Sequence, residues 1–285
     1  MDLVISMNDM DINKIYNEDC LETMERMDDN FIDLAVTSPP YDNLRTYNND
    51  IDKTWDESVW KPIIKELYRV TKDGGVVVWV VSDATINGSE TGTSFRQALW
   101  TMECGFNLHD TMIYKQKGTG AKGSNKAYWQ SFDYMFVFSK GKIKTVNRIN
   151  DVKNTAGGKK RSHSNSKKYE KIGSRTERNN IKNPIWSVRP NVWEYAQGVN
   201  DRTDHTAPFP EKLANDHIIS WSNEGDLVYD PFMGSGTTAK MSILNNRNWI
   251  GSEISKEYCD IVKKRIKIGF KEKEYQDKIK NMEIF

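Results

Sequence analysis

Short apolar runs alternate with segments of helical periodicity along most of this 285-residue chain. The run 34–36 precedes a helical pattern over 61–70, and the apolar run 76–81 follows that pattern. Near the C-terminus, the apolar segments 227–229 and 249–250 each precede a helical segment. Repeated strand-then-helix units form mostly parallel sheets that helices cover on both faces. The sequence therefore predicts an α/β fold with a mostly parallel, doubly wound sheet.

The remaining elements are predicted from their periodicity and from their end signals. Ser94 is expected to cap a helix that ends before Gly105. Further strands are expected over 108–114 and 134–138, and further helices over 210–221, 237–244 and 255–268.

The segment Thr37-Ser38-Pro39-Pro40-Tyr41 follows an apolar run and is predicted to be a loop at the end of a buried strand. Two adjacent prolines fix two φ angles at about −65° and remove two N–H donors, so the carbonyl groups of Ser38 and Pro39 can point into a cavity. The aromatic face of Tyr41 comes next. Acceptors beside an aromatic face suit a flat ring with an amino group, such as a nucleobase. An ordinary Pro-Pro turn is the alternative.

A second motif, Asp230-Pro231-Phe232-Met233-Gly234-Ser235-Gly236-Thr237-Thr238, follows a predicted strand and opens a predicted helix. Its two glycines allow a tight turn and the close approach of a ligand, and Thr237 or Thr238 is expected to cap the helix. The lysine of a phosphate-binding loop is missing. Glu253 follows the next strand, where an acid binds ribose hydroxyls in dinucleotide-type folds. An adenosine ligand without phosphate, such as S-adenosylmethionine (SAM), suits this motif; a structural turn is the alternative.

Positive charge is concentrated in the middle of the chain. The net charge is +1, but residues 140–189 contain fifteen Lys or Arg and three Asp or Glu, which makes this block +12 and the rest −11. The block is rich in Ser, Asn and Gly and ends in a region with Trp186 and Trp193. Such a composition suits a phosphate backbone, although a solvated loop has a similar composition.

Taken together, these motifs resemble the amino-group DNA methyltransferases of the circularly permuted class, in which the catalytic loop precedes the SAM loop. Asn17-Glu18-Asp19-Cys20-Leu21-Glu22 is similar to the family segment whose acid contacts the SAM adenine, and Asp19 matches that acid by position. His205-Thr206-Ala207-Pro208-Phe209-Pro210 is similar to the family's His-Pro-Ala-x-Phe-Pro segment, with Thr206 in place of the usual proline. The resemblance covers nearly the whole chain.

The resemblance implies a Rossmann-like SAM-dependent methyltransferase fold in three parts: a catalytic half (1–139), a basic target-recognition insertion (140–204) and a SAM-binding half (205–285). It implies SAM as the cofactor, no metal, and double-stranded DNA as the partner. A cytoplasmic protein of prokaryotic or phage origin is expected, with or without a cognate restriction endonuclease, and a homodimer is compatible with the family. No membrane span is expected, because the longest apolar run, 76–81, is far shorter than the roughly 20 residues required.

The resemblance also assigns roles to individual residues. The predicted catalytic residues are Ser38, Pro39, Pro40 and Tyr41. The predicted cofactor-binding residues are Asp19, Thr37, Asp230, Phe232, Gly234, Ser235, Gly236, Thr237 and Glu253. The predicted DNA-binding residues follow from positive charge: Arg45 just after the proline loop, Lys122 in a glycine-rich loop, and, in the basic block, Lys159, Lys160, Arg161, Lys167, Lys168, Arg175 and Arg178. A surface salt bridge is the alternative for Arg45, and a simple mobile connection is the alternative for the loop that contains Lys122.

In the implied reaction, acceptors on Ser38 and Pro39 stabilise the positive charge that grows on an exocyclic amine as it attacks the SAM methyl group. The base must leave the duplex, and stacking on Tyr41 offsets part of the few kcal/mol required. In this family, Ser before Pro-Pro-Tyr goes more often with cytosine N4 and Asp or Asn with adenine N6, so cytosine N4 is favoured over adenine N6. A catalytically silent nucleic-acid-binding module is the alternative from another class, and methylation of RNA or of a small amine is a second enzyme alternative.

Overall fold

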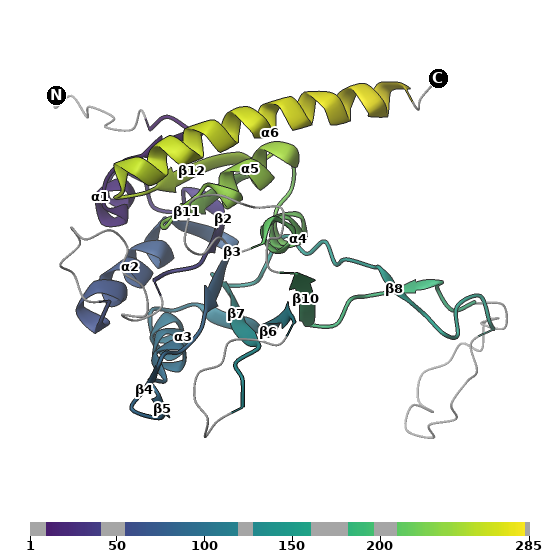
Figure 1. The fold of residues 1–285 in the computed structure, drawn as a ribbon, viewed down its shortest axis with the longest axis horizontal. Coiled ribbons are helices and arrows are strands. Elements are labelled where there is room, and N and C mark those ends of the chain that lie inside the picture. Colours follow the sequence, from purple (N-terminus) through teal and green to yellow (C-terminus); the bar gives the residue numbers. More distant parts are fainter. Residues whose placement is uncertain (1–9, 41–54, 119–127, 161–181, 197–209, 283–285) are drawn as a thin grey trace, which may run out of the picture. The chain divides into compact units, whose positions relative to one another are not determined.

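The computed structural model describes residues 10–40, 55–118, 128–160, 182–196 and 210–282. Internal contacts divide the chain into two compact units, Met1–Asn147 with Asn191–Phe285, and Arg148–Pro190. The larger unit holds an eight-stranded sheet (Figure 1). Its strands, in spatial order, are β1 (Lys14–Tyr16), β12 (Asn248–Ser252), β11 (Leu227–Asp230), β2 (Ile32–Thr37), β3 (Thr71–Val81), β7 (Phe132–Ser139), β6 (Asn107–Lys117) and β10 (Val192–Ala196).

Most neighbouring strands of this sheet are parallel. The first five strands in this spatial order, β1, β12, β11, β2 and β3, all run in one direction, and β6 pairs in parallel with β10. β7 lies between β3 and β6 and is antiparallel to both. The carboxyl ends of β1, β12, β11, β2 and β3 therefore meet at one edge, which is where ligands bind in open α/β sheets.

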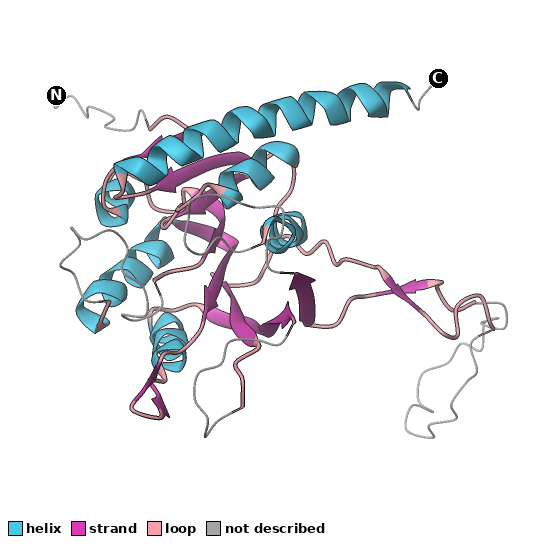
Figure 2. Cartoon of the chain, viewed as in Figure 1, coloured by secondary structure: helices cyan, strands magenta, loops and turns pink. Residues whose placement is uncertain are grey.

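Helices pack in two layers, one on each face of the sheet (Figures 1 and 2). One layer contains α1 (Cys20–Glu25), α2 (Glu57–Val70) and α3 (Thr93–Glu103), and the other contains α4 (Glu211–Trp221), α5 (Thr237–Leu244) and α6 (Lys256–Met282). Val77, Trp79 and Val81 of β3 join the core that includes α1 and α2. The alternate residues of this strand are buried as well and point to the opposite face. Burial on both faces explains why 76–81 is continuously apolar.

The predicted α/β class with its mostly parallel sheet is confirmed, but one prediction about α3 and one about α6 are wrong. Ser94 lies inside α3, whose N-cap is Gly92. The backbone N–H and the hydroxyl of Ser94 both donate to the Asp83 carboxylate, at 2.8 and 2.6 Å. The helix predicted over 255–268 continues to Met282, because its last turns carry i,i+4 ion pairs between Lys273 and Asp277 and between Glu274 and Lys278.

Two small antiparallel pairs complete the described secondary structure. β4 (Thr85–Ile86) and β5 (Ser89–Glu90) form a hairpin in the larger unit. β8 (Val152–Lys153) and β9 (Trp186–Ser187) form a ribbon in the unit Arg148–Pro190. Within the described ranges, every helix is too short or too polar to cross a membrane.

Candidate active site

Polar segments follow the carboxyl ends of four adjacent parallel strands. Residues 17–19 follow β1, Glu253 follows β12, the loop 231–236 follows β11, and the loop 38–40 follows β2. Because these strands are neighbours in that order, the four segments line one edge of the sheet. The fold thus brings the predicted catalytic loop beside the predicted cofactor loop, although about 190 residues separate them in the chain.

A buried carboxylate, that of Asp230, joins the two loops. It accepts hydrogen bonds from the Thr37 hydroxyl (2.6 Å), the Thr238 hydroxyl (2.7 Å) and the Phe232 backbone N–H (3.0 Å). The Thr238 hydroxyl also lies 3.2 Å from the Val36 carbonyl oxygen. Asp230 is only 1% exposed, and burial raises its pKa to about 6 even though the three hydrogen bonds favour the charged form. One side chain therefore fixes the end of β2, the start of the glycine loop and the start of α5.

A second carboxylate, that of Glu253, holds the glycine loop from the β12 side. Its two oxygens accept the backbone N–H groups of Gly234 and Ser255, each at 2.8 Å. The side chain is half-buried, and burial raises its pKa. Two backbone donors fix the orientation of the carboxylate, and each oxygen keeps a second lone pair for a ligand hydroxyl.

Gly236 is required by the geometry of the loop. Its φ is 84°, and a Cβ atom at this position would lie 3.1 Å from the Val262 side chain. Gly236 is also the N-cap of α5, and the helix has no side-chain cap bond. The predicted cap by Thr237 or Thr238 is therefore wrong, because the Thr238 hydroxyl donates to Asp230 instead, while the side chain of Thr237 makes no cap bond.

Three aromatic rings meet at the loop. Phe232 is half-buried and makes edge-to-face contacts with Trp55, at 5.4 Å between ring centroids, and with Trp79, at 6.1 Å. The Trp79 indole donates to the Gln97 amide oxygen at 2.8 Å, which fixes that ring. The buried indole N–H of Trp55 has no acceptor in the part of the chain that the structure describes. Phe232 thus packs against two indole rings, of which that of Trp79 is fixed by a hydrogen bond.

A buried arginine on α6, Arg265, is hydrogen-bonded to the glycine loop. Arg265 on α6 is 6% exposed and donates to the Ser235 hydroxyl (2.8 Å) and to the Glu211 carboxylate (2.6 Å). Lys240 Nζ lies 3.0 Å from the same carboxylate. Burial alone would raise the pKa of Glu211, but these two cations outweigh it and lower the pKa. Sequence reasoning missed this network; its one signal was a cationic residue on the buried face of α6, three positions after Val262.

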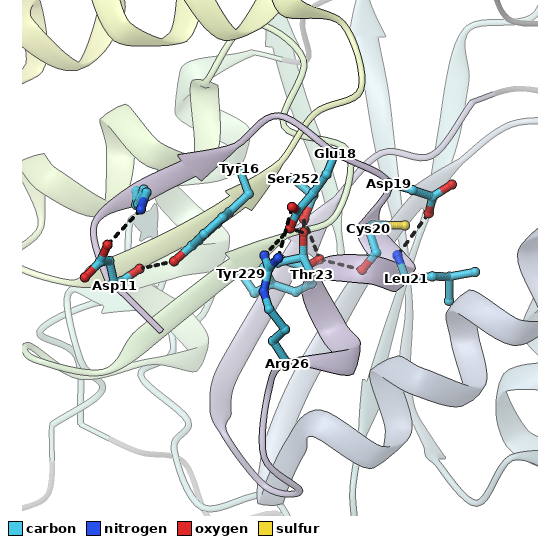
Figure 3. A network of polar contacts seen from close by, with 11 residues as sticks. Asp11, Tyr16, Glu18, Asp19, Cys20, Leu21, Thr23, Arg26, Tyr229 and Ser252 are labelled. Carbon is cyan, nitrogen blue, oxygen red and sulfur yellow. Dashed lines mark hydrogen bonds and ion pairs between the residues drawn. The ribbon is translucent and has the colours of Figure 1, made fainter. Parts of the chain in front are cut away.

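At the other end of the site, a polar network positions the start of α1 (Figure 3). The Glu18 carboxylate accepts the Thr23 hydroxyl at 2.7 Å and the Arg26 guanidinium at 3.1 Å. The Thr23 hydroxyl accepts from Ser252 at 2.8 Å, and Ser252 is bonded to the Tyr229 hydroxyl. Asp19 points away from this network in Figure 3 and caps α1 through the Leu21 N–H at 3.0 Å. Of the two acids, Glu18 thus belongs to the polar network, whereas the Asp19 carboxylate caps α1 outside that network.

The structure places the other predicted site residues as follows. Ser38 and Pro40 are half-buried, whereas Pro39 and Thr237 are buried. Lys159 and Lys160 are exposed in the smaller unit. Several predicted residues lie outside the described residues: Tyr41, Arg45, Lys122, Arg161, Lys167, Lys168, Arg175 and Arg178.

The assembled edge suits an adenosine-type ligand. It offers a fixed carboxylate for ribose hydroxyls, a half-exposed phenyl ring for an adenine, and a glycine loop that permits close approach. It lacks the lysine that phosphate loops carry. Within the described ranges, no group of three His, Cys, Asp or Glu side chains is placed to hold a metal ion.

Known proteins match this chain over most of its length. A family model for N6/N4 methyltransferases, described as DNA methylase, matches residues 32–264. The orphan methyltransferase M.BamHII of Bacillus amyloliquefaciens is 54% identical over 250 residues, which is 85% of this chain and 91% of that protein. The solved structure of the PvuII DNA methyltransferase (cytosine-N4-specific) has a TM-score of 0.65 and 19% identity, covering 88% of this chain and 85% of its own. The solved structure of the M1.HpyAVI-SAM complex has a TM-score of 0.60 and 21% identity, and the match covers 89% of this chain and 98% of that chain.

Proposed function

This chain belongs to the N6/N4 DNA methylase family, as its sequence motifs predicted, and we propose that it methylates an extruded base of double-stranded DNA at cytosine N4. The SAM-dependent methylation of DNA amino groups is common to the family. The observation that supports our assignment of residues is the buried Asp230 carboxylate, which bonds to Thr37 and Thr238. This link holds the loop 38–40 beside the glycine loop.

We assign different parts of the SAM molecule to different side chains along the sheet edge. We assign the ribose hydroxyls to the Glu253 carboxylate, the adenine ring to Phe232 and the adenine amino group to Asp19. Gly234 and Gly236 let the backbone approach the ligand. Because the Ser235 hydroxyl is bonded to Arg265, we assign Ser235 a supporting role through its side chain. Thr37, Asp230 and Thr237 are buried, so they support the two loops from within.

The loop after β2 supplies the acceptors for the reaction. When bound, SAM supplies a methyl group activated by its positively charged sulfur. The exocyclic nitrogen of the base forms the new bond to the methyl carbon, the sulfur keeps the electron pair of the broken bond, and one amine proton passes to solvent. Acceptors on Ser38 and Pro39 lie where positive charge grows on that nitrogen, and fixed acceptors need no reorganisation as the charge develops. Tyr41 provides a face for the extruded base.

The preference for cytosine rests on Ser38 in the motif and is tested by product analysis. DNA from cells that express the protein is digested to nucleosides and analysed by mass spectrometry, and the same DNA is sequenced with a modification-sensitive method to locate the site. We expect N4-methylcytosine. N6-methyladenine alone would contradict the preferred base, and the absence of any modified nucleoside would contradict the proposed activity.

Substituted proteins test the assigned roles. Tyr41→Ala should leave SAM affinity in calorimetry nearly unchanged and lower turnover, with Tyr275→Ala, an exposed tyrosine on α6, as the matched control. An equal loss of SAM affinity would instead place Tyr41 in the cofactor site.

We further propose that the segment 140–204 recognises the DNA target. The orphan designation of the Bacillus amyloliquefaciens relative supports action without a cognate endonuclease.

A further inference from the structure

The unit Arg148–Pro190 contains a two-stranded ribbon without a buried core among its described residues. Val152 pairs with Ser187 and Lys153 with Trp186. Further backbone pairing extends this ladder at both ends. At one end the Arg189 N–H donates to the Ile149 carbonyl, and at the other end Lys160 forms an antiparallel bridge with Lys182. The described residues 148–160 and 182–190 are all exposed or half-exposed. Because isolated two-stranded ribbons are at best marginally stable in water, this element is expected to gain stability from a partner.

The ribbon exposes apolar as well as charged side chains. Trp186 is 52% exposed and Ile185 59%. Its described residues include six Lys or Arg and a single acid, Asp151, which forms an ion pair with Arg189. An aromatic side chain among basic residues fits a polyanion that also presents flat or apolar groups, and duplex DNA presents both.

The register places the basic and apolar side chains relative to each other. Lys153 and Trp186 are directly opposite in an antiparallel pair, so their side chains share one face of the ribbon, whereas the other pair, Val152 and Ser187, lies on the opposite face. Lys159, Lys160 and Lys182 gather where the ladder ends. The major groove of B-DNA admits a two-stranded ribbon of this kind.

We propose that this ribbon enters the major groove of the duplex and determines the target site. Lys159, Lys160 and Lys182 hold phosphates, while Trp186 and Lys153 face the base edges. Lysine can donate to guanine O6 and N7, and an indole can pack on a thymine methyl group. The inference rests on the proposed DNA methylation and adds to it the recognising element, the groove and the residues that discriminate bases.

Salt-dependent binding to DNA tests the phosphate contacts. The full-length triple variant Lys159→Gln, Lys160→Gln and Lys182→Gln is compared with wild type on two duplexes, one with the site identified by sequencing and one with that site scrambled. We expect weaker binding to both duplexes by a similar factor, and a slope of log affinity against log salt that is lower by up to about 2.7, or about 0.9 per lost contact. The matched control removes three exposed lysines of α6: Lys267→Gln, Lys271→Gln and Lys280→Gln. An unchanged affinity and slope for the ribbon variant would overturn the proposal.

Single substitutions on the two faces test base recognition. Trp186→Ala should lower the ratio of specific to scrambled affinity by roughly tenfold with little change in salt slope, and Trp186→Phe should restore part of it. Val152→Ala, on the opposite face, should change the ratio much less. An unchanged ratio in Trp186→Ala, or an equal loss in Val152→Ala, would refute the assignment. Circular dichroism and the SAM dissociation constant report whether each variant is folded. Methyl transfer by the wild type tests the proposed function separately, because that function can hold while the ribbon assignment fails.

Discussion

Replacing Asp230 by asparagine should stabilise this protein at neutral pH, although the carboxylate makes three hydrogen bonds. An asparagine Oδ1 can keep the bonds from Thr37 and from the Phe232 N–H, both of which go to one carboxylate oxygen. Its Nδ2 would face Thr238, whose hydroxyl can accept this N–H and donate to the Val36 carbonyl, 3.2 Å away. No buried polar group then loses its partner, and the buried negative charge is removed.

The pKa of Asp230 gives the size and the pH window of this effect. The native pKa is about 6, whereas an unfolded aspartate has a pKa of about 3.9. Between these values the native state binds more protons than the unfolded state, so the free energy of unfolding falls as pH rises. The contribution of the protonated group is complete below about pH 4 and is lost as pH passes through 6. A difference of about 2 pKa units corresponds to about 3 kcal/mol.

Urea unfolding at pH 4, 5, 6 and 7, followed by tryptophan fluorescence, measures the effect. The stability advantage of Asp230→Asn over wild type should be near zero at pH 4 and grow towards about 3 kcal/mol at pH 7. Asp260→Asn, which removes an exposed carboxylate on α6, controls for the change in net charge and should show no such growth. If the advantage of Asp230→Asn did not grow with pH, or if this variant were less stable than wild type at pH 7, the reasoning would be refuted.

Two other predictions concern the glycine loop and its support. Gly236→Ala and Gly225→Ala should each lower the free energy of unfolding by about 1 kcal/mol, because both glycines have positive φ. Only Gly236→Ala should also weaken SAM binding in calorimetry. A Cβ atom at position 236 would contact Val262, whereas nothing lies within 4 Å of a Cβ atom at position 225. Equal SAM affinities would contradict this. Glu211→Gln leaves Arg265 buried without its carboxylate, so the free energy of unfolding should fall by about 2 kcal/mol and SAM affinity should fall with it, whereas Glu272→Gln should have a smaller effect. A stability loss without any change in SAM affinity would show that this network does not position the loop.

The central strands could be predicted from the sequence because burial leaves a direct trace in it. Each of the strands β2, β3 and β11 contains a continuous apolar run. Strand direction leaves no such trace, since β7 is as apolar as β3 and yet runs the opposite way. β1 and β10 were not anticipated: β1 has three residues, and β10 buries only Trp193 and Tyr195.

The candidate site was predictable where a role depends on neighbouring residues. Gly236 stands where a strand turns sharply into a helix, and Glu253 follows the next strand, so position alone pointed to both. Side-chain pairing across the fold was not predictable. The contact between Arg265 and Glu211 joins residues 54 positions apart, and the Ser94 hydroxyl meets Asp83 rather than capping its own helix. Such partners are decided by tertiary packing, which periodicity does not encode.

The Asp230 link implies that chain connectivity matters little to this site. β2 and β11 are hydrogen-bonded neighbours, so their two loops emerge together whichever strand comes first along the polypeptide. What holds the loop 38–40 beside the glycine loop is the pairing of these two strands and one shared carboxylate, that of Asp230, not the long segment that joins the loops. A gene could therefore be cut and rejoined in another order, and both orders would rebuild the same reaction centre as long as these two strands still paired.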